Sequence, residues 1–231
     1  HVTNCMGDNG LVWLFSWNPI QLTQFDPISR QKRNVALPSD LLVTGLEVNQ
    51  MVWDTMDKGL WMATSALGLI KLNPEGEIIQ RYSTQSESNL PFPTDNIKVI
   101  YFGPDETLWV GHSMGLSRIA KKEITHYQVR PSTNLEVVGI LPHGDRYLWL
   151  STNQGIFRFD IQTGESLGFP KGSEVSIREY NRASSFKSST GNMFFGSLNG
   201  VVAFDPDSLS NFLRPFTTQK VVLTAFSKYN I

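Results

Sequence analysis

The side chains best suited to catalysis or metal binding are few in this chain and widely spaced. The 231 residues include four histidines, His1, His112, His126 and His143, whose ring nitrogens are potential bases or metal ligands. No two of them are four residues apart, the spacing of a common zinc motif. The single cysteine, Cys5, has no partner for a disulfide or a cysteine-based metal site. The sequence therefore predicts no metal site and no cofactor.

Acidic residues and hydroxyl nucleophiles form no recognisable catalytic set either. The chain has neither a Gly-x-Ser-x-Gly elbow nor a Gly-x-x-x-x-Gly-Lys phosphate loop. Asp205-Pro206-Asp207 is an acidic segment without the regular spacing of a calcium loop, and Asp-Pro after a strand is typical of a turn. Six carboxylates occur singly and are interpreted as solvated loop residues: Asp95, Asp105, Glu136, Asp145, Glu165 and Glu179. These patterns indicate a binding protein that is not an enzyme.

Composition narrows the class of protein further. A hydrophobic fraction of 40% and a charged fraction of 18% are typical of a folded globular chain. A net charge of −1 excludes the basic footprint of a nucleic-acid-binding protein. Apolar runs are all shorter than the ~20 residues of a membrane-spanning helix. The chain begins at His1 without a charged-then-apolar signal segment, so we expect a fragment of a larger protein.

A repeated segment provides the main structural signal. A large apolar pair, small residues, a turn and a glycine recur around five aromatic anchors: Trp13, Trp61, Trp109, Trp149 and Phe194. The anchors are 40 to 48 residues apart, a period typical of four-stranded propeller blades. Short alternating segments rich in Val, Ile, Phe and Thr, bounded by Gly, Asn, Asp and Pro, indicate strands and not helices. The predicted fold class is an all-β propeller with about five four-stranded blades.

One blade is predicted strand by strand around Trp109. The expected strands, from the innermost outward, are 97–102, 108–112, 116–120 and 124–128. Small residues two positions after the anchors would let neighbouring sheets approach closely: Ala63, Gly111, Ser151 and Gly196. We expect most of the tryptophans to pack in the core between blades: Trp13, Trp53, Trp61, Trp109 and Trp149. Trp17 falls in a turn region, where core and exposed roles are equally open.

These repeats resemble the two-component regulator propeller family. The segment Leu108–His112 followed by Gly115-Leu116 matches its signature, as does Leu148–Thr152 followed by Gly155-Ile156. The sequence departs from the pattern at His112, where the family has Thr, at Phe194, where it has Trp, and by one extra residue near Leu67. The resemblance implies the periplasmic sensor part of a membrane-anchored histidine kinase or diguanylate cyclase, with contact to the membrane only through the parent chain.

The C-terminal part adds a second resemblance. Residues 200–206 are similar to the last blade of such propellers, and 221–230 to the first strand of the immunoglobulin-like domain that follows them. We therefore expect blades over 1–213 and a linker plus that strand over 214–231. Because the family usually has seven blades, the resemblance implies a fragment of a seven-bladed ring, with a closed five-bladed ring as the alternative. The lack of a clear inner strand before Trp13 favours the fragment.

A fragment of a ring would expose two apolar blade faces, so we expect self-association through these faces or within the dimer of the parent protein. Loops before the inner strands and after the second strands should share one face, rich in amide, Arg and aromatic side chains suited to sugars. Candidate ligand-binding residues are Trp17, Asn18, Asp95, Asn96, His112, Arg130, Asn153, Arg178, Tyr180 and Asn199. The same face would carry Thr94, Asn134, Gln154 and Asn181.

The sequence thus predicts the sensing or scaffold part of a bacterial signalling protein, which binds an oligosaccharide or other small ligand. Two alternatives remain. One is an interaction scaffold that dimerises without a small ligand, and the other is a lyase or glycosidase built on a propeller.

Overall fold

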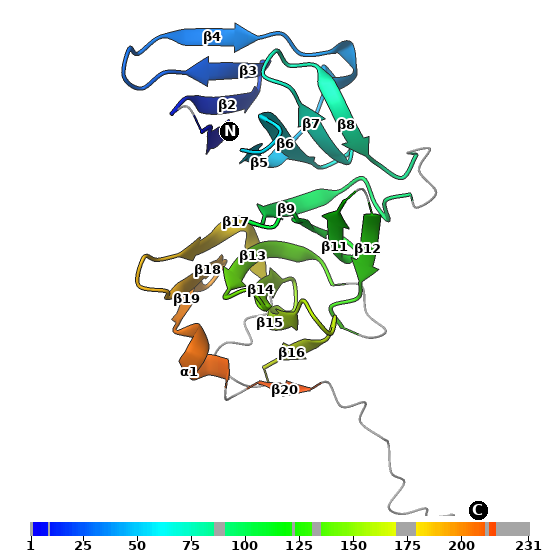
Figure 1. Cartoon of the computed structure of the whole chain (residues 1–231), viewed down its shortest axis with the longest axis vertical. Coiled ribbons are helices and arrows are strands. Elements are labelled where there is room, and N and C mark those ends of the chain that lie inside the picture. The colour runs from blue at the N-terminus through cyan, green and yellow to red at the C-terminus, as the bar shows by residue number, and fades with distance from the viewer. Residues whose placement is uncertain are drawn as a thin grey trace, which may run out of the picture.

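The computed structural model of the chain describes residues 2–8, 10–85, 91–121, 123–130, 135–169, 179–210 and 213–215. They form five antiparallel sheets, the blades, which follow one another around a common centre (Figure 1). The predicted all-β propeller with about five blades is confirmed. The total number of blades in the parent ring stays a prediction.

Within each blade the strands are hydrogen-bonded in chain order. Blade 1 contains β1 (Val2–Met6), β2 (Val12–Trp17), β3 (Ile20–Phe25) and β4 (Lys32–Val35). Blade 2 contains β5 (Val48–Asp54), β6 (Gly59–Thr64), β7 (Leu69–Leu72) and β8 (Ile78–Tyr82). Blade 3 contains β9 (Ile97–Phe102), β10 (Leu108–His112), β11 (Gly115–Ala120) and β12 (Glu123–Tyr127).

Blades 4 and 5 depart from the four-stranded pattern. Blade 4 contains β13 (Val137–His143), β14 (Tyr147–Thr152), β15 (Gly155–Asp160), β16 (Ser166–Gly168) and the added strand β20 (Arg214–Pro215). In blade 5 the described residues form three strands, β17 (Tyr180–Lys187), β18 (Met193–Ser197) and β19 (Gly200–Phe204). The only helical elements among the described residues are the 3-10 turn η1 (Ser39–Leu41) and α1 (Pro206–Ser210). No described helix is long and apolar enough to span a membrane.

The strand predictions around Trp109 agree with β9 to β12 to within one residue at each end. The expectation that no inner strand precedes Trp13 is wrong, because β1 pairs with β2 through Cys5 opposite Trp13. The predicted first strand of a following domain lies outside the described residues. Residues 214 and 215, predicted to begin a linker, extend the sheet of blade 4 beside β16.

In blades 2 to 5 the second strand ends in a side chain that accepts a hydrogen bond from the following turn. The four residues in this position are Thr64, His112, Thr152 and Ser197. The backbone N–H of Gln154, for example, donates to Oγ1 of Thr152 over 3.0 Å, and that of Met114 to Nδ1 of His112 over 3.2 Å. Gly115 closes the latter turn with a φ of 129°, which favours glycine. His112 therefore performs the capping role that Thr performs in its neighbours.

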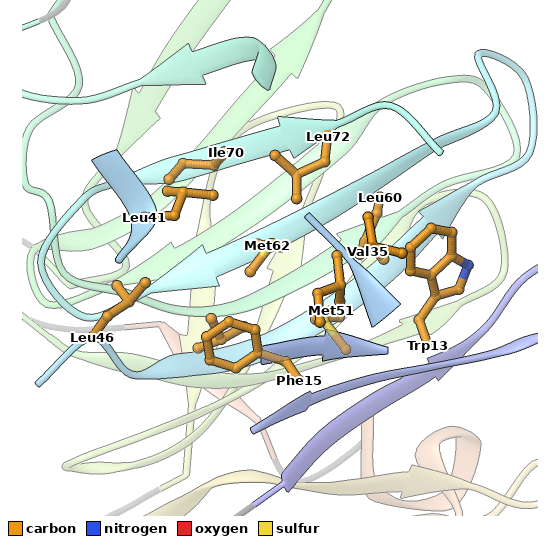
Figure 2. Packing of buried hydrophobic residues seen from close by; sticks show 12 residues of the cluster. Trp13, Phe15, Val35, Leu41, Leu46, Met51, Leu60, Met62, Ile70 and Leu72 are labelled. Carbon is orange, nitrogen blue, oxygen red and sulfur yellow. The ribbon is translucent and has the colours of Figure 1, made fainter. Parts of the chain in front are cut away.

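The hydrophobic core consists of four clusters, each shared by two consecutive blades. In the first cluster Trp13 and Phe15 of blade 1 pack toward Met62 and its neighbours in blade 2 (Figure 2). Trp61, Trp109 and Trp149 belong to the next three clusters in turn. The predicted core role of the tryptophans is confirmed, with Trp53 partly buried and stacked on Trp13 at 5.5 Å between ring centroids.

Gly111 is one of the small residues that follow an aromatic anchor. A methyl group here would lie 2.5 Å from Cγ1 of Val99 and 2.8 Å from both Cγ1 and the carbonyl oxygen of Val137. Val137 belongs to the next blade, so Gly111→Ala would push the two sheets apart. We expect the free energy of unfolding to fall by on the order of 1 kcal/mol, measured by urea denaturation with tryptophan fluorescence.

The control for Gly111→Ala is Ala36→Val, which adds methyl groups at an exposed position and should leave stability unchanged. Equal losses in the two variants would contradict a specific role for the close approach of blades 3 and 4.

Candidate functional site

A pocket of about 420 Å³ opens where the inner strands begin. Its walls come from the residues at the start of β5, β9, β13 and β17 and from the turns after β6, β14 and β18. The lining residues are Glu47, Ser65, Asn96, Lys98, Glu136, Val138, Asn153, Glu179, Tyr180, Asn181, Arg182 and Leu198. Four blades therefore contribute to one polar site near the centre of the fold.

The pocket rim is built from a repeated position, the residue just before each inner strand. Glu47, Asn96, Glu136 and Glu179 occupy it in blades 2 to 5. A backbone hydrogen bond recurs there, because the carbonyl oxygens of the first three accept from the turn of the same blade, over 3.0 Å, 3.3 Å and 3.2 Å. The same backbone geometry thus holds two carboxylates, Glu47 and Glu136, and the amide of Asn96 at the opening, and Glu179 takes the equivalent position in blade 5.

Two basic side chains form ion pairs with carboxylates of the pocket rim. Nζ of Lys98 lies 2.5 Å from Oε1 of Glu136, and both side chains are largely shielded from solvent. Nη1 of Arg182 lies 3.5 Å from Oε2 of Glu47 and also donates to the side-chain oxygen of Asn49. Arg182 stands on β17 and Glu47 before β5, so this pair joins blades 5 and 2 across the pocket.

Three of the candidate ligand-binding residues meet in this pocket, Asn96, Asn153 and Tyr180, together with Asn181 of the same predicted face. Oδ1 of Asn96 is buried and has no hydrogen-bond donor among the described residues. Oδ1 of Asn153 accepts from the backbone N–H of Glu136 over 3.3 Å, which aims its NH₂ group as the donor. Tyr180 is 4% exposed, and burial raises the pKa of its phenol to about 12, so it lines the pocket as a neutral group.

The other candidate residues lie elsewhere. Trp17 packs partly buried against the core between blades 1 and 2, and Asn18 is exposed in the turn after it. Asp95 accepts hydrogen bonds from the backbone N–H and Oγ1 of Thr84 over 2.8 Å and 2.7 Å, which fixes the chain entering blade 3. Its carboxylate therefore has a structural role.

Arg130 and Asn199 are also outside the pocket lining. Nη1 of Arg130 lies 3.4 Å from Oε1 of Gln154, and Asn199 is exposed in the turn between β18 and β19. Arg178 lies outside the described residues.

His112 does not reach the pocket, because it is 1% exposed inside blade 3. Nδ1 of His112 accepts the Met114 amide, so Nε2 carries the proton and donates to Oγ of Ser117 over 2.7 Å. The Ser117 hydroxyl in turn donates to Nδ1 of His126 over 2.7 Å. Burial and the nearby His126 lower the pKa of His112 to about 3, and burial lowers that of His126. A serine facing a histidine resembles a catalytic pair, but Ser117 is fully buried, so its hydroxyl is not open to solvent.

The sequence interpretation missed the charged part of the pocket. Glu136 and Glu179 were expected to be solvated loop residues, and Glu47, Lys98 and Arg182 were not singled out. The position of these residues in the repeat could have identified them. Each blade from 2 to 5 has a polar residue just before its inner strand: Glu47, Asn96, Glu136 and Glu179.

Comparisons with known proteins place this geometry among related folds. No family model matches the chain. A similar curated protein is histidine kinase P4 of Formosa agariphila, 23% identical over 270 residues, which covers 93% of this chain and 19% of the kinase. The chain thus spans about a fifth of the length of that relative.

Solved structures show the same fold at low sequence identity. The extracellular domain of a hybrid two-component system from B. thetaiotaomicron has a TM-score of 0.56 and 18% identity, over 90% of this chain and 34% of that one. Virginiamycin B lyase from Staphylococcus aureus has a TM-score of 0.61 and 19% identity, over 88% of this chain and 69% of the lyase. The resemblance predicted from the repeats is confirmed: the chain has the β-propeller fold found in the extracellular domains of hybrid two-component systems.

Proposed function

We propose that this chain is the extracytoplasmic sensing part of a bacterial membrane-anchored signalling protein and binds an oligosaccharide in the pocket at its centre. The observation that carries the proposal is the buried, unpaired Oδ1 of Asn96 in a pocket lined by charged and amide side chains from four blades. The similarity to a histidine kinase and to two-component extracellular domains supports the signalling context and the location.

The chemistry of the lining suits a polyhydroxylated ligand. Carboxylates accept and cations donate hydrogen bonds, while the side chain of Asn153 does both, so neighbouring hydroxyl groups of a sugar find complementary partners. The pocket volume, about 420 Å³, is in the range of small-molecule sites. A ligand that contacts blades 2 and 5 at once would favour one blade arrangement over another, which is what a sensor requires.

Binding without catalysis is the second part of the proposal. A glycosidase needs two carboxyl groups poised as acid and base or nucleophile, whereas Glu136 and Glu47 are engaged by Lys98 and Arg182. The similarity to virginiamycin B lyase makes a propeller lyase the second candidate function. Product analysis after incubation with each saccharide separates the two candidates.

Asn96→Ala is expected to weaken oligosaccharide binding about tenfold, as for the loss of one well-placed hydrogen bond in a site built for it. The same change should leave the stability of the protein unaltered, because it removes an unpaired buried acceptor. Calorimetric titration of the full parent ectodomain with a panel of oligosaccharides measures the affinity, and Asn153→Ala is a second pocket variant.

The matched control is Asn199→Ala, an exposed amide outside the pocket, which should bind as the unchanged protein does. Saturable binding that ignores both pocket variants would move the site elsewhere. No binding by any saccharide would eliminate the oligosaccharide and favour the ligand-free scaffold, and formation of products would favour the lyase or glycosidase.

A further inference from the structure

The pocket contains two ion pairs that differ in length and in exposure. Nζ of Lys98 lies 2.5 Å from Oε1 of Glu136, and the two side chains are 13% and 29% exposed. Nη1 of Arg182 lies 3.5 Å from Oε2 of Glu47, and each of these side chains is 43% exposed. The first pair is therefore short and shielded, whereas the second is loose and open to a ligand that enters from solvent.

The two pairs also connect different parts of the fold. Lys98 stands on β9 and Glu136 just before β13, in blades 3 and 4, which share a hydrophobic cluster. Arg182 and Glu47 belong to blades 5 and 2, and no cluster of the described residues joins those two blades. The pair of Arg182 and Glu47 can therefore adjust around a ligand without disturbing a packed interface between neighbouring blades.

The guanidinium group of Arg182 is held in place by a second partner. It donates to the side-chain oxygen of Asn49, and Nδ2 of Asn49 donates over 2.6 Å to the backbone carbonyl oxygen of Ile97 in β9. This contact does not involve Glu47, so it positions Arg182 even when the carboxylate turns toward a ligand. A guanidinium group has five N–H donors in a fixed fork, which leaves donors for the ligand.

Glu47 offers the matching acceptor. Among the described residues its carboxylate is engaged only through Oε2, and a carboxylate accepts hydrogen bonds through both oxygens. Its backbone is fixed, because its carbonyl oxygen accepts from the backbone N–H of Ser65 over 3.0 Å. Two neighbouring hydroxyl groups can donate to the two carboxylate oxygens, and a hydroxyl oxygen can accept from a guanidinium group at the same time. A vicinal diol therefore fits this pair of side chains.

The charge of the pocket disfavours an anionic saccharide. Its lining includes three carboxylates, those of Glu47, Glu136 and Glu179, and two basic side chains, which leaves one net negative charge. Both basic side chains already contact a carboxylate. A sugar that carries a carboxylate or a sulfate would add a like charge to this site, which lowers affinity.

We propose that Arg182 and Glu47 determine the specificity of the pocket by binding a vicinal diol of a neutral saccharide. This assignment rests on the proposed oligosaccharide function and names the ligand chemistry and the residues within it. The two hydroxyl groups donate to the carboxylate of Glu47, and one of them accepts from the guanidinium group of Arg182. Because Arg182 and Glu47 come from blades 5 and 2, the bound diol links these blades, whereas the pair of Lys98 and Glu136 stays closed.

Calorimetric titration of the full parent ectodomain tests the ligand chemistry. The probes are cellotetraose and mannotetraose, their derivatives with methylated vicinal hydroxyl groups, and the tetrasaccharide of glucuronic acid. At least one of the two neutral tetrasaccharides is expected to bind, and methylation of its diol should weaken binding about tenfold. The tetrasaccharide of glucuronic acid is expected to bind about fivefold more weakly than that neutral sugar, or not at all.

The variants Glu47→Gln and Arg182→Gln test the two residues. Each is expected to weaken binding of the free diol about tenfold and to reduce the difference between the free and the methylated sugar. A general loss of stability would lower both affinities alike and leave that difference unchanged. The control is Arg146→Gln, which removes the arginine of a similarly exposed ion pair outside the pocket and should bind as the unchanged protein does.

The results distinguish a wrong ligand contact from a wrong function. Binding that Asn96→Ala weakens, but that ignores methylation of the diol or the variants of Glu47 and Arg182, would overturn the assignment and leave the oligosaccharide function standing. Equal or tighter binding of the glucuronic acid tetrasaccharide would overturn the neutral character of the ligand in the same way. No binding of any of these saccharides would overturn the oligosaccharide function itself, and the assignment with it.

Discussion

Lys71→Met is expected to lower the free energy of unfolding by about 3–5 kcal/mol, because it leaves a buried carboxylate without its cation. Nζ of Lys71 lies 2.7 Å from Oδ2 of Asp54, and the two side chains are 3% and 4% exposed. Burial raises the pKa of Asp54, but hydrogen bonds from Lys71 and from the backbone N–H groups of Asp57 and Met56 outweigh it and hold that pKa below its ordinary value. Asp54 is therefore ionised at neutral pH and depends on Lys71. Urea denaturation measures the loss.

The chain offers a matched control in the ion pair of Lys58 with Asp8. Lys58 is 64% exposed, so Lys58→Met should cost at most about 1 kcal/mol. Asp54→Asn combined with Lys71→Met should recover part of the loss, because the amide needs no counter-ion. A loss for Lys71→Met no larger than that of the surface control would show that Asp54 tolerates burial without its cation.

Acid is expected to destabilise the protein through His112. Its pKa is about 3 in the folded chain and near the ordinary 6.5 when unfolded, so the unfolded chain binds the proton more tightly. The contribution of neutral His112 is complete above pH 6.5 and is lost as the pH falls. By proton linkage, the free energy of unfolding should fall by about 3 kcal/mol between pH 6.5 and pH 4 from this residue alone.

His112→Thr isolates this contribution. Thr64 and Thr152 cap the equivalent turns in blades 2 and 4, so threonine should preserve the turn while removing the titrating ring. Urea denaturation at several pH values should give a shallower pH dependence for His112→Thr, whatever its stability at pH 7. An equally steep dependence in both proteins would assign the acid sensitivity to other groups.

The fold was predictable because the same contact, an aromatic residue packed between two blades, recurs along the chain. Each anchor aromatic residue fills an interface between blades, so its spacing reveals the blades directly, as the agreement around Trp109 shows. The inner strand β1 was missed because its sequence, Val-Thr-Asn-Cys-Met, lacks the apolar alternation of β9 or β13. It is held by pairing with β2, which strand composition does not reveal.

The candidate site was only partly predictable for a different reason. Asn96, Asn153 and Tyr180 follow from loop chemistry at the strand ends, and they meet in one pocket. The charged residues that face the centre are set by how the blades curve around it, which the sequence does not reveal. In the sequence alone, Lys98 and Arg182 look like ordinary strand residues. His112 was assigned to the ligand-binding face because it ends a strand, yet its ring is folded back as a turn cap.

The core is divided into four clusters, and each cluster joins only two consecutive blades. The stability of a blade should therefore depend mainly on its direct neighbours in the chain. Among the described residues, blades 2 to 4 each share a core cluster with two neighbours, and blades 1 and 5 each share one. The ion pair of Arg182 with Glu47 is a contact of a different kind, because it couples blades that are not neighbours in the chain. A ligand seated between them would reinforce that coupling. Occupancy of the pocket would then change how the blades unfold together, and not only the stability of the blade it touches.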